Sequence, residues 1–267
     1  NRTAEQVAEG RVMNSVAHMS ATIEIEHELG IGDWPGTDAE DSYHHHYNGW
    51  DDERRFSGVF EKPARIIDYR IYLPALMAEF ESRGGDLVIR DLSVAEIEQL
   101  TEQHDLVVAT TGKGEIGALF PRRQDKSPYT TPQRKLAVGF WKGVAPREPR
   151  GVEISVVPPA GELLTLPMWS FSGPVHALLF ESVAGGPQEA LTDQRYEEDP
   201  AAYRALTLRV LEEFHPTVFE RVNPAEFELQ SGARDILQGA VTPVLREDYV
   251  LLPNGRFLLA LGDVHMS

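Results

Sequence analysis

The sequence predicts an α/β protein in which a mainly antiparallel β-sheet is inserted into a parallel α/β layer. Between residues 72 and 109, segments with helical and strand-like patterns alternate, which is the succession expected of a parallel layer. From about residue 120, strand-like segments follow one another with Pro and Gly between them, as in antiparallel sheets. The chain has 267 residues, of which 42% are hydrophobic, so it is long enough to bury a sizeable core.

The first layer begins with a helix over residues 72–82. Leu76, Met77 and Phe80 recur there at helical spacing, and Gly84-Gly85 is typical of a helix C-terminus. The layer then continues with a short buried strand over residues 87–89, a helix that begins at the capping box Ser93-x-x-Glu96, and an apolar strand over residues 106–109.

The inserted sheet is predicted from strand-like segments that are followed by a helix. The strands are expected over residues 136–141, 152–157, 162–166 and 175–181. Pro200 begins a helix that runs to Phe214 and carries its apolar residues on one side. Extended segments over residues 235–243 and 256–261 then return the chain to the first layer.

The charge and the residue usage exclude several classes of function. The net charge of −17 repels phosphates and anionic lipids, so neither nucleic acid nor a membrane is an expected partner. The chain has no cysteine, which excludes disulfides, thiolate metal sites and a cysteine nucleophile and favours a cytoplasmic location. The sequence contains no long apolar run that would predict a membrane span. It also contains no apolar N-terminal segment that would predict a signal peptide.

The segment Thr111-Gly-Lys-Gly-Glu-Ile-Gly117 formally matches a dinucleotide fingerprint and follows an apolar strand. The fingerprint needs a long helix whose N-terminus faces the pyrophosphate, but Pro121 comes too soon after Gly117 for such a helix. We therefore interpret the segment as a tight surface turn. The sequence also lacks the nucleophile elbow, the His-Glu-x-x-His zinc motif and the Walker loop.

The run His44-His45-His46, with Asp41 nearby, has the composition of a metal site. In a strand adjacent side chains point to opposite faces, so His44 and His46 can converge whereas His45 cannot. A third ligand would have to come from elsewhere, and no metal is predicted. Two interpretations remain: one or two of these histidines line a pocket, or they serve packing.

A series of short motifs spans the chain in a fixed order, and no single motif is specific. The motifs are Arg11, Asn14 and Ala17-His18; Trp34-Pro35; Asp68-Tyr69-Arg70 with Tyr72 and Pro74; Thr111-Gly112-Lys113; Ser127-Pro128; Pro132-Gln133-Arg134; Asp235-Ile-Leu-Gln-Gly239; and Leu261-Gly-Asp263. In this order and spacing they resemble the oxygenase component of two-component, FAD-dependent styrene and indole monooxygenases.

This resemblance implies an FAD-binding, Rossmann-like layer of the flavoprotein hydroxylase type. Residues 1–119 and 236–267 would form the FAD-binding domain, which is incomplete in this chain, and residues 120–235 the substrate-binding domain. A separate NADH-dependent flavin reductase would supply reduced FAD, which reacts with O2. A flavin hydroperoxide would then epoxidise or hydroxylate an aromatic alkene or an indole-like substrate. The family also suggests a homodimer.

The resemblance also assigns roles to particular residues. Arg11 and Asn14 fall where the family places residues beside the flavin ring and the substrate, and they are the candidate catalytic residues. An Asn amide can donate and accept at the ring edge, and an Arg can favour the anionic reduced flavin. Without the resemblance, Asn14 would be interpreted as a cap and Arg11 as a surface charge. Further candidates are Asp263 for a ribityl or ribose hydroxyl, and Val12, Met13, His44 and Leu179 for the substrate pocket.

The pocket departs from the styrene type at two positions. Asp41 replaces an expected aromatic residue, and Ala64 replaces a small hydroxyl residue, which is closer to the indole type. A carboxylate in an apolar pocket costs several kcal/mol unless it is paired or reached by solvent. Asp41 is therefore expected to be paired, or to recognise a polar or basic group on a larger substrate.

The family's N-terminal strand, Gly-rich phosphate loop and first helix would precede Asn1, and a flavin-contacting helix would follow Ser267. The chain by itself is therefore expected to bind FAD weakly or not at all, because it lacks the backbone amides that bind the pyrophosphate. The competing hypothesis is a non-catalytic, cofactor-deficient substrate-binding module of the same family, which binds a ligand without oxygen transfer.

Overall fold

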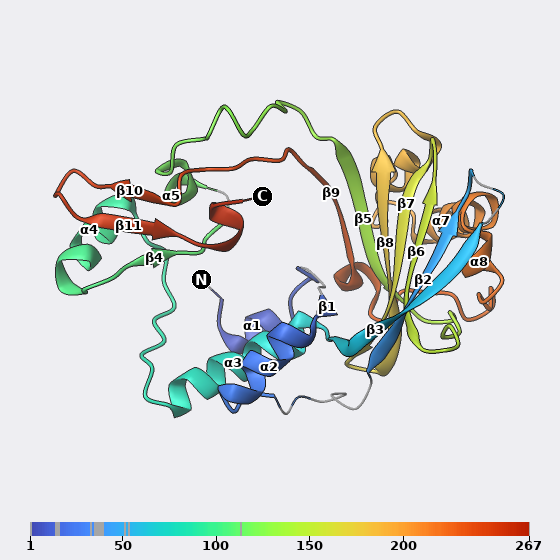
Figure 1. Cartoon of the computed structure of the whole chain (residues 1–267), viewed down its shortest axis with the longest axis horizontal. Coiled ribbons are helices and arrows are strands. Elements are labelled where there is room, and N and C mark those ends of the chain that lie inside the picture. The colour runs from blue at the N-terminus through green and yellow to red at the C-terminus, as the bar shows by residue number, and fades with distance from the viewer. Residues whose placement is uncertain are drawn as a thin grey trace. The chain divides into compact units, whose positions relative to one another are not determined.

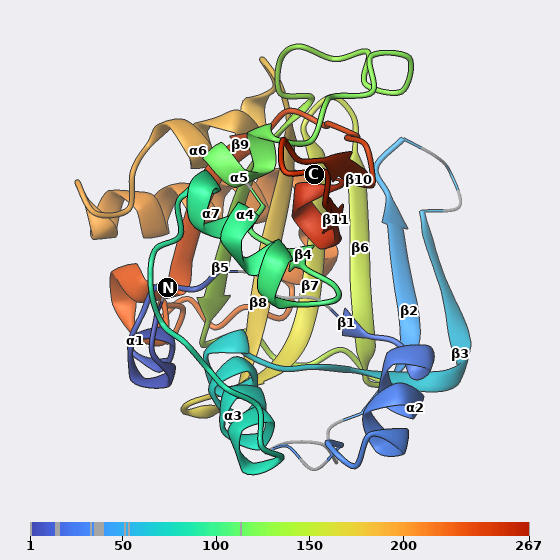
Figure 2. The ribbon, with the colours of Figure 1, turned by 90° about the vertical axis from the view of Figure 1, so that its left-hand side faces the viewer.

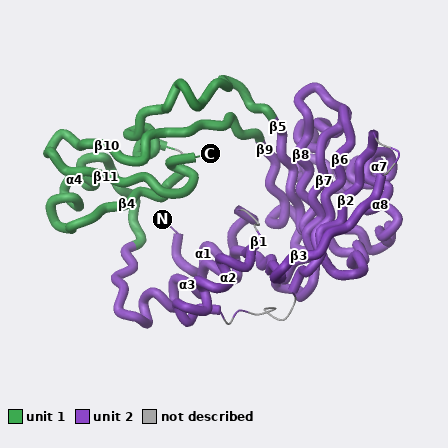
Figure 3. Tube along the Cα trace, in the orientation of Figure 1, with its two compact units in different colours: residues 1, 89–133, 240–267 green, residues 2–88, 134–239 purple. Residues whose placement is uncertain are grey.

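The computed structural model describes residues 2–13, 17–32, 34, 40–50, 52, 54–112 and 114–266 (Figure 1). The candidate residue Asn14 lies outside the described residues. The chain divides into two compact units (Figure 3). Residues 2–88 and 134–239 form the larger one, here the sheet unit, and residues 89–133 and 240–267 form the small unit.

The sheet unit contains a sheet in which the described residues form eight strands, here the large sheet (Figure 2). Its strand order is β1-β3-β2-β6-β7-β8-β5-β9. Among its strand pairs with a described register, β2 and β6 are parallel and the others are antiparallel. The strands are β1 (Ala17–His18), β2 (Asp41–Asn48), β3 (Arg55–Ile66), β5 (Arg134–Trp141), β6 (Gly151–Val157), β7 (Gly161–Ser170), β8 (Gly173–Val183) and β9 (Ile236–Val241).

The predicted strands of the inserted sheet correspond to β5, β6, β7 and β8, so this part of the prediction is confirmed. The hairpin of β2 and β3 was not predicted to join the same sheet. β2 reads Asp-Ser-Tyr-His-His-His-Tyr-Asn and lacks the alternation of apolar and polar residues that marks a strand. It becomes a strand because it is paired on both sides, with β3 and with β6.

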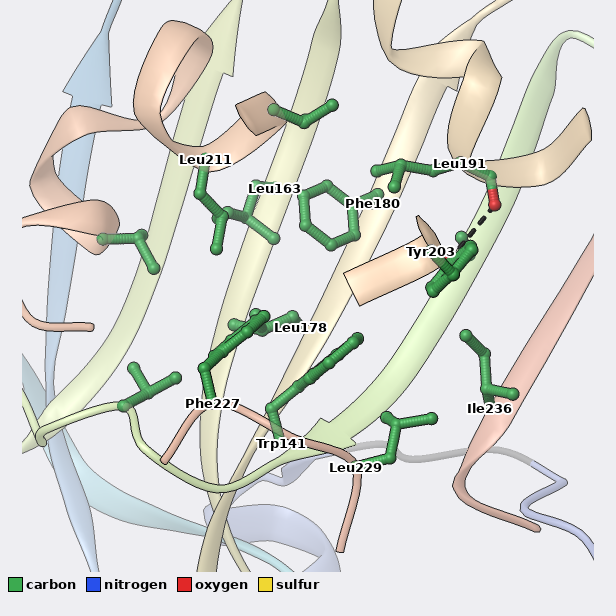
Figure 4. Close-up of a cluster of buried hydrophobic side chains, with 14 residues drawn as sticks. Trp141, Leu163, Leu178, Phe180, Leu191, Tyr203, Leu211, Phe227, Leu229 and Ile236 are labelled. Carbon is green, nitrogen blue, oxygen red and sulfur yellow. Dashed lines mark hydrogen bonds between the residues drawn. The ribbon is translucent and has the colours of Figure 1, made fainter. Parts of the chain in front are cut away.

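One face of the large sheet is covered by α6 (Ala190–Asp193), α7 (Pro200–Phe214) and α8 (Pro216–Phe219) (Figures 1 and 2). α7 begins where predicted, with Pro200 in its first turn and the Asp199 carboxylate accepting a hydrogen bond from the Ala202 amide at 2.9 Å. Beneath the helices the Trp141 and Phe227 rings stack at 4.3 Å, and the Tyr203 hydroxyl donates to the Leu191 carbonyl (Figure 4). This is the main core of the sheet unit.

The described residues of the sheet unit form three further helices and two 3-10 turns: α1 (Ala4–Ala8), α2 (Ser20–Glu28), α3 (Tyr69–Ser82), η1 (Pro187–Glu189) and η2 (Gly232–Asp235). α3 is the predicted helix, extended by one turn because the Asp68 carboxylate caps the Arg70 amide. The helix ends at Ser82. Gly84 follows with a φ of 86°, which favours glycine, and the Gly85 amide donates to the Phe80 carbonyl.

The small unit contains a sheet in which the described residues form three strands, in the order β10-β11-β4. β11 (Phe257–Ala260) pairs parallel with β4 (Val108–Ala109) and antiparallel with β10 (Tyr249–Leu251). The unit also holds α4 (Val94–Gln103), which has the predicted capping box, α5 (Glu115–Ala118) and the 3-10 turn η3 (Gly262–Val264). The parallel pair confirms the interpretation that residues 106–109 and 256–261 share one layer. The prediction that residues 235–243 also return to this layer is wrong, because they form β9, which lies at the edge of the large sheet beside β5.

The prediction of a buried strand over residues 87–89 is wrong. These residues form no strand, and the Val88 and Ile89 side chains are 60% and 39% exposed. A three-residue apolar run becomes a strand only if another strand offers it a hydrogen-bonding edge, and no described strand pairs with it.

Truncating Leu211 to Ala should lower the free energy of unfolding by about 2–5 kcal/mol. The Leu211 side chain is fully buried between α7 and the large sheet, so the change leaves a cavity. Urea denaturation measures the loss, and Val88→Ala serves as the control because its side chain is exposed and should change stability by less than about 0.5 kcal/mol. Equal losses for the two variants would contradict this description of the core.

Candidate functional site on the open face of the large sheet

The face of the large sheet opposite α7, here the open face, carries a row of side chains in register, one from each of six strands. This cross-strand row consists of Phe56, His46, Ile154, Leu164, Leu179 and Val138. Ile154, Leu164 and Leu179 are half-buried. Because side chains alternate along each strand, their neighbours Leu163, Leu178 and Phe180 point into the core under the helices. The row is thus a partly open, largely apolar surface.

Beside the cross-strand row lies a second, buried cluster on the same face. Val12 is 2% exposed and packs there with Phe140, Val152 and Ala177. Val152 is the register partner of His44, and Ala177 is two residues from Leu179 on β8. The structure therefore places the predicted substrate residues Val12, His44 and Leu179 on one face of one sheet. Met13 directly follows Val12 and is half-buried.

Arg11 is exposed, and its described partners are not the predicted substrate residues. Its guanidinium forms an ion pair with Glu197, and its Nε donates to the Ala233 carbonyl at 3.3 Å. Both side chains of the pair are nearly half exposed, so the pair contributes little to stability. The predicted role of Arg11 beside a flavin stays a prediction.

The three consecutive histidines behave as strand alternation requires. The His44 and His46 rings lie on one face with their centroids 5.5 Å apart, while His45 bonds to the Ser57 hydroxyl and the Pro149 carbonyl on the other side. Burial, followed by the charge of neighbouring histidines, lowers the pKa of both His44 and His46. They are therefore neutral at pH 7. No group of side chains suited to a metal ion occurs among the described residues.

Aromatic rings from β2 and β3 lie at one end of the open face. The His44 ring packs edge-on against Phe60 at 4.4 Å, and the His46 ring stacks on Phe56 at 4.5 Å. Neutral imidazoles against phenyl rings form a surface that offers hydrogen bonds without a fixed charge.

Asp41 and Ala64, the two departures noted in the sequence, are register partners on β2 and β3. Both are buried, and the Asp41 carboxylate lies 3.1 Å from the Arg150 Nε. The expectation that this carboxylate is paired is therefore met by an ion pair, although neither carboxylate oxygen has a hydrogen bond to any described residue. Burial raises the pKa of Asp41 to about 7, and the Arg150 charge opposes the rise.

Asp263 lies in η3, directly after β11, and is exposed. Because β4 and β11 run parallel, the loops that follow them emerge at the same edge of the small sheet, and the Leu261 amide donates to the Ala109 carbonyl at 3.0 Å. Gly112 lies in the loop after β4 with a φ of 69°, and a Cβ there would stand 3.7 Å from the Asp263 Cβ. In α/β sheets, ligands bind outside the carboxyl ends of the strands, which is where this pair of loops lies.

The rejected dinucleotide fingerprint forms only the four-residue helix α5, between Gly114 and Leu119. This helix is too short to present a macrodipole to a pyrophosphate, so the rejection of the fingerprint agrees with the structure. The predicted surface turn is instead a short helix in which Gly117 is buried.

The sequence did not reveal what Asp68, Arg70 and Asp235 do, although all three stand in motifs that carry the resemblance. In the structure they form one buried charged cluster. The signal was present: Asp68 and Arg70 are charged residues set among Ile66, Ile67 and Ile71, and a charge in an apolar segment has to find a partner.

Asp41→Asn should remove a pH dependence of stability. Burial raises the pKa of Asp41 from its ordinary value of 3.8 to about 7 in the folded protein, so the folded state holds this proton more tightly than the unfolded state does. Stability is therefore lost as pH rises from about 4 to about 7, by at most about 4 kcal/mol. The free energy of unfolding of the Asn variant, relative to that of the wild type, should therefore rise across this window and stay constant above it. Chemical denaturation at pH 5, 7 and 8 measures the effect.

The exposed Asp86→Asn is the matched control, and its difference from the wild type should not change across this window. A constant difference between Asp41→Asn and the wild type would show that Asp41 is ionised throughout.

Comparison with known proteins places these features in context. Residues 112–221 match the family model described as "Styrene monooxygenase A putative substrate binding domain". The whole chain is 39% identical to styrene monooxygenase StyA of Pseudomonas fluorescens and 38% identical to its counterpart from another Pseudomonas. It spans 64% of the length of each of these relatives.

Solved structures support the fold at low sequence identity. The tetrameric form of 2-methyl-3-hydroxypyridine-5-carboxylic acid oxygenase aligns with 96% of this chain and 66% of its own, at 13% identity and a TM-score of 0.60. The myxobacterial chondrochloren halogenase CndH, an FAD-dependent halogenase, aligns with 92% of this chain and 58% of its own, at 13% identity and a TM-score of 0.58. The chain thus shares the fold of these two enzymes, and along its whole length its sequence is similar to that of styrene monooxygenases that are longer than it is.

Proposed function

We propose that this chain belongs to a flavin-dependent monooxygenase that uses reduced FAD and O2 to epoxidise or hydroxylate a small aromatic alkene or an indole-like substrate. The observation that carries the proposal is the apolar cross-strand row, with the Val12 cluster beside it on the same face. The likeness to styrene monooxygenases over all 267 residues supports the choice of reaction.

The row fits a small aromatic molecule better than a charged one. Ile154, Leu164 and Leu179 offer half-buried aliphatic contacts, and His44 and His46 end the surface as neutral rings. An apolar surface with a few placed polar groups is the usual form of a small-molecule site. The buried Asp41 is already paired with Arg150, which favours a neutral substrate over a basic one. Ala64 is smaller than a hydroxyl residue and closer to the indole type, so an indole-like substrate is also proposed.

The residues in the small unit fit part of an FAD molecule. The turn around Gly112 leaves space beside the exposed Asp263 carboxylate, which suits a hydrogen bond to a ribityl or ribose hydroxyl. Arg11 and Asn14 are proposed beside the flavin ring. Bound in reduced form, FAD would supply the electrons that activate O2. The chain's own contribution would be to hold and orient the substrate on a largely apolar face.

The remaining assignments are proposals of the same kind. Residues 1–119 and 236–267 would bind FAD and residues 120–235 the substrate, within a cytoplasmic protein that forms a homodimer. An NADH-dependent flavin reductase would provide the reduced FAD. Among the described residues, no helix has both the length and the apolar character needed to cross a membrane.

The direct test mixes the protein with separately reduced FAD, O2 and either styrene or indole, and detects epoxide or indigo-type products by chromatography. Product that depends on the protein would support the proposed monooxygenase. Peroxide release without product would instead favour the cofactor-deficient binding module, provided that intact mass confirms the chain and that substrate binding is detected by calorimetry.

Leu179→Ala should lower kcat/KM about ten-fold, because a half-buried aliphatic contact in the middle of the cross-strand row is lost. Val59→Ala is the matched control: Val59 lies on β3 of the same sheet as the register partner of Tyr43, off the cross-strand row, and is 69% exposed. Its kcat/KM should stay within two-fold of the wild type. Equal effects of the two variants on kcat/KM would indicate that the substrate does not bind to this face.

A further inference from the structure

The start of α3 contains a buried cluster of three charges. Arg70, Asp68 and Asp235 are each exposed by 1% or less. The Arg70 Nη2 lies 2.7 Å from both the Asp68 Oδ2 and the Asp235 Oδ1, and its Nε donates to Asp68 as well. Such a cluster is tolerated in a protein interior only when its members are paired and hydrogen-bonded.

The surroundings of the cluster complete its hydrogen bonds. The Ser170 hydroxyl donates to Asp68 at 2.6 Å, and the Ser231 amide donates to Asp235. The Phe140 and Phe171 rings lie 5.4 and 5.3 Å from the guanidinium carbon of Arg70. Burial disfavours the charge of Arg70, but the hydrogen bonds and charges of the two aspartates outweigh it and raise the pKa of Arg70. The guanidinium therefore stays charged.

One donor of Arg70 reaches beyond the carboxylates. Its Nη1 donates to the Arg234 carbonyl at 3.2 Å, and the same carbonyl accepts the Val12 amide at 2.7 Å. This single oxygen thus joins the charged cluster to the segment that carries Val12.

The turn η2 holds this segment at two more points. The Ala233 carbonyl accepts the Arg11 Nε at 3.3 Å, and the Arg234 Nη1 donates to the Glu9 carbonyl at 3.0 Å. Residues 9–12 form no strand of their own, so these contacts with η2 substitute for sheet pairing there.

We propose that Arg70 and Asp235 are positioning residues of the candidate site: they fix η2, and through the Arg234 carbonyl they hold residues 9–13 against the open face of the large sheet. The inference rests on the proposed function for its catalytic meaning. The residue type matters, because the planar guanidinium has enough donors to bind Asp68, Asp235 and the carbonyl together, whereas an ammonium cannot match that geometry.

The first experiment measures hydrogen exchange by mass spectrometry on the 267-residue chain and its Arg70→Lys and Asp235→Asn variants. Peptides that cover residues 9–13 and 232–236 should exchange at least ten-fold faster in both variants, while β7 and β8 peptides stay unchanged. Arg83→Lys, at the exposed end of the same helix, is the matched control and should change neither region.

Unchanged exchange over residues 9–13 would overturn the proposal, and so would equal acceleration in β7 and β8, because that would indicate a general loss of stability. Asp235→Asn leaves Arg70 in place and decides the question if Arg70→Lys does not fold.

The second readout is the product formed per reduced FAD oxidised, with styrene as the substrate. In a wild type that makes product, this yield should fall at least five-fold in both variants while KM changes by less than two-fold. An unchanged yield would overturn the positioning role. If the wild type makes no product, the proposed function fails, and hydrogen exchange alone decides whether the cluster holds residues 9–13.

Discussion

The large sheet has two faces that must be covered in different ways, and the rest of the sheet unit follows from this constraint. On β8, Leu178 and Phe180 point to one side while Ala177 and Leu179 point to the other. The first side is sealed by α6, α7 and α8 over a core that includes Trp141 and Phe227. The other is sealed in part by the Val12 cluster and otherwise remains half-buried. A surface suited to a ligand results from covering one face completely and the other incompletely.

Buried polar groups fix how the covering elements sit on the sheet. His215, after α7, contacts the Ser155 hydroxyl on β6 and the Gln188 side chain, each at 2.7 Å. Burial lowers the pKa of His215 to about 3, so the contact is made by a neutral imidazole. On the other face, the Arg70 cluster ties η2 to α3. Hydrophobic packing alone tolerates small sliding movements, whereas a buried hydrogen bond fails when its partners shift, so both networks specify position more than they add stability.

The charges of the open face lie beside the cross-strand row rather than in it. The half-buried register partners Glu162 and Glu181 are two residues from Leu164 and Leu179 on the same face. The Asp41 and Arg150 pair lies where β2 begins, and Arg11 pairs with Glu197 outside the face. The cross-strand row between them holds aliphatic side chains and neutral rings. Such a distribution suits the proposed reaction, because a reaction that depends on a cofactor requires orientation of the substrate more than acid–base groups.

Several features could be predicted from the sequence because they depend on local chemistry. Asp199-Pro200 begins α7, Ser93 and Glu96 cap α4, and alternating apolar residues mark β5 to β8; each signal acts within a few residues. The order of the motifs was also enough to indicate the fold of the flavoprotein hydroxylases. Only the tertiary structure decided that β2 and β3 complete the large sheet, that residues 87–89 form no strand, and that Asp41 faces Ala64 and pairs with Arg150. It alone revealed that Asp68, Arg70 and Asp235 meet, because residues 165 positions apart become neighbours only through strand pairing and burial.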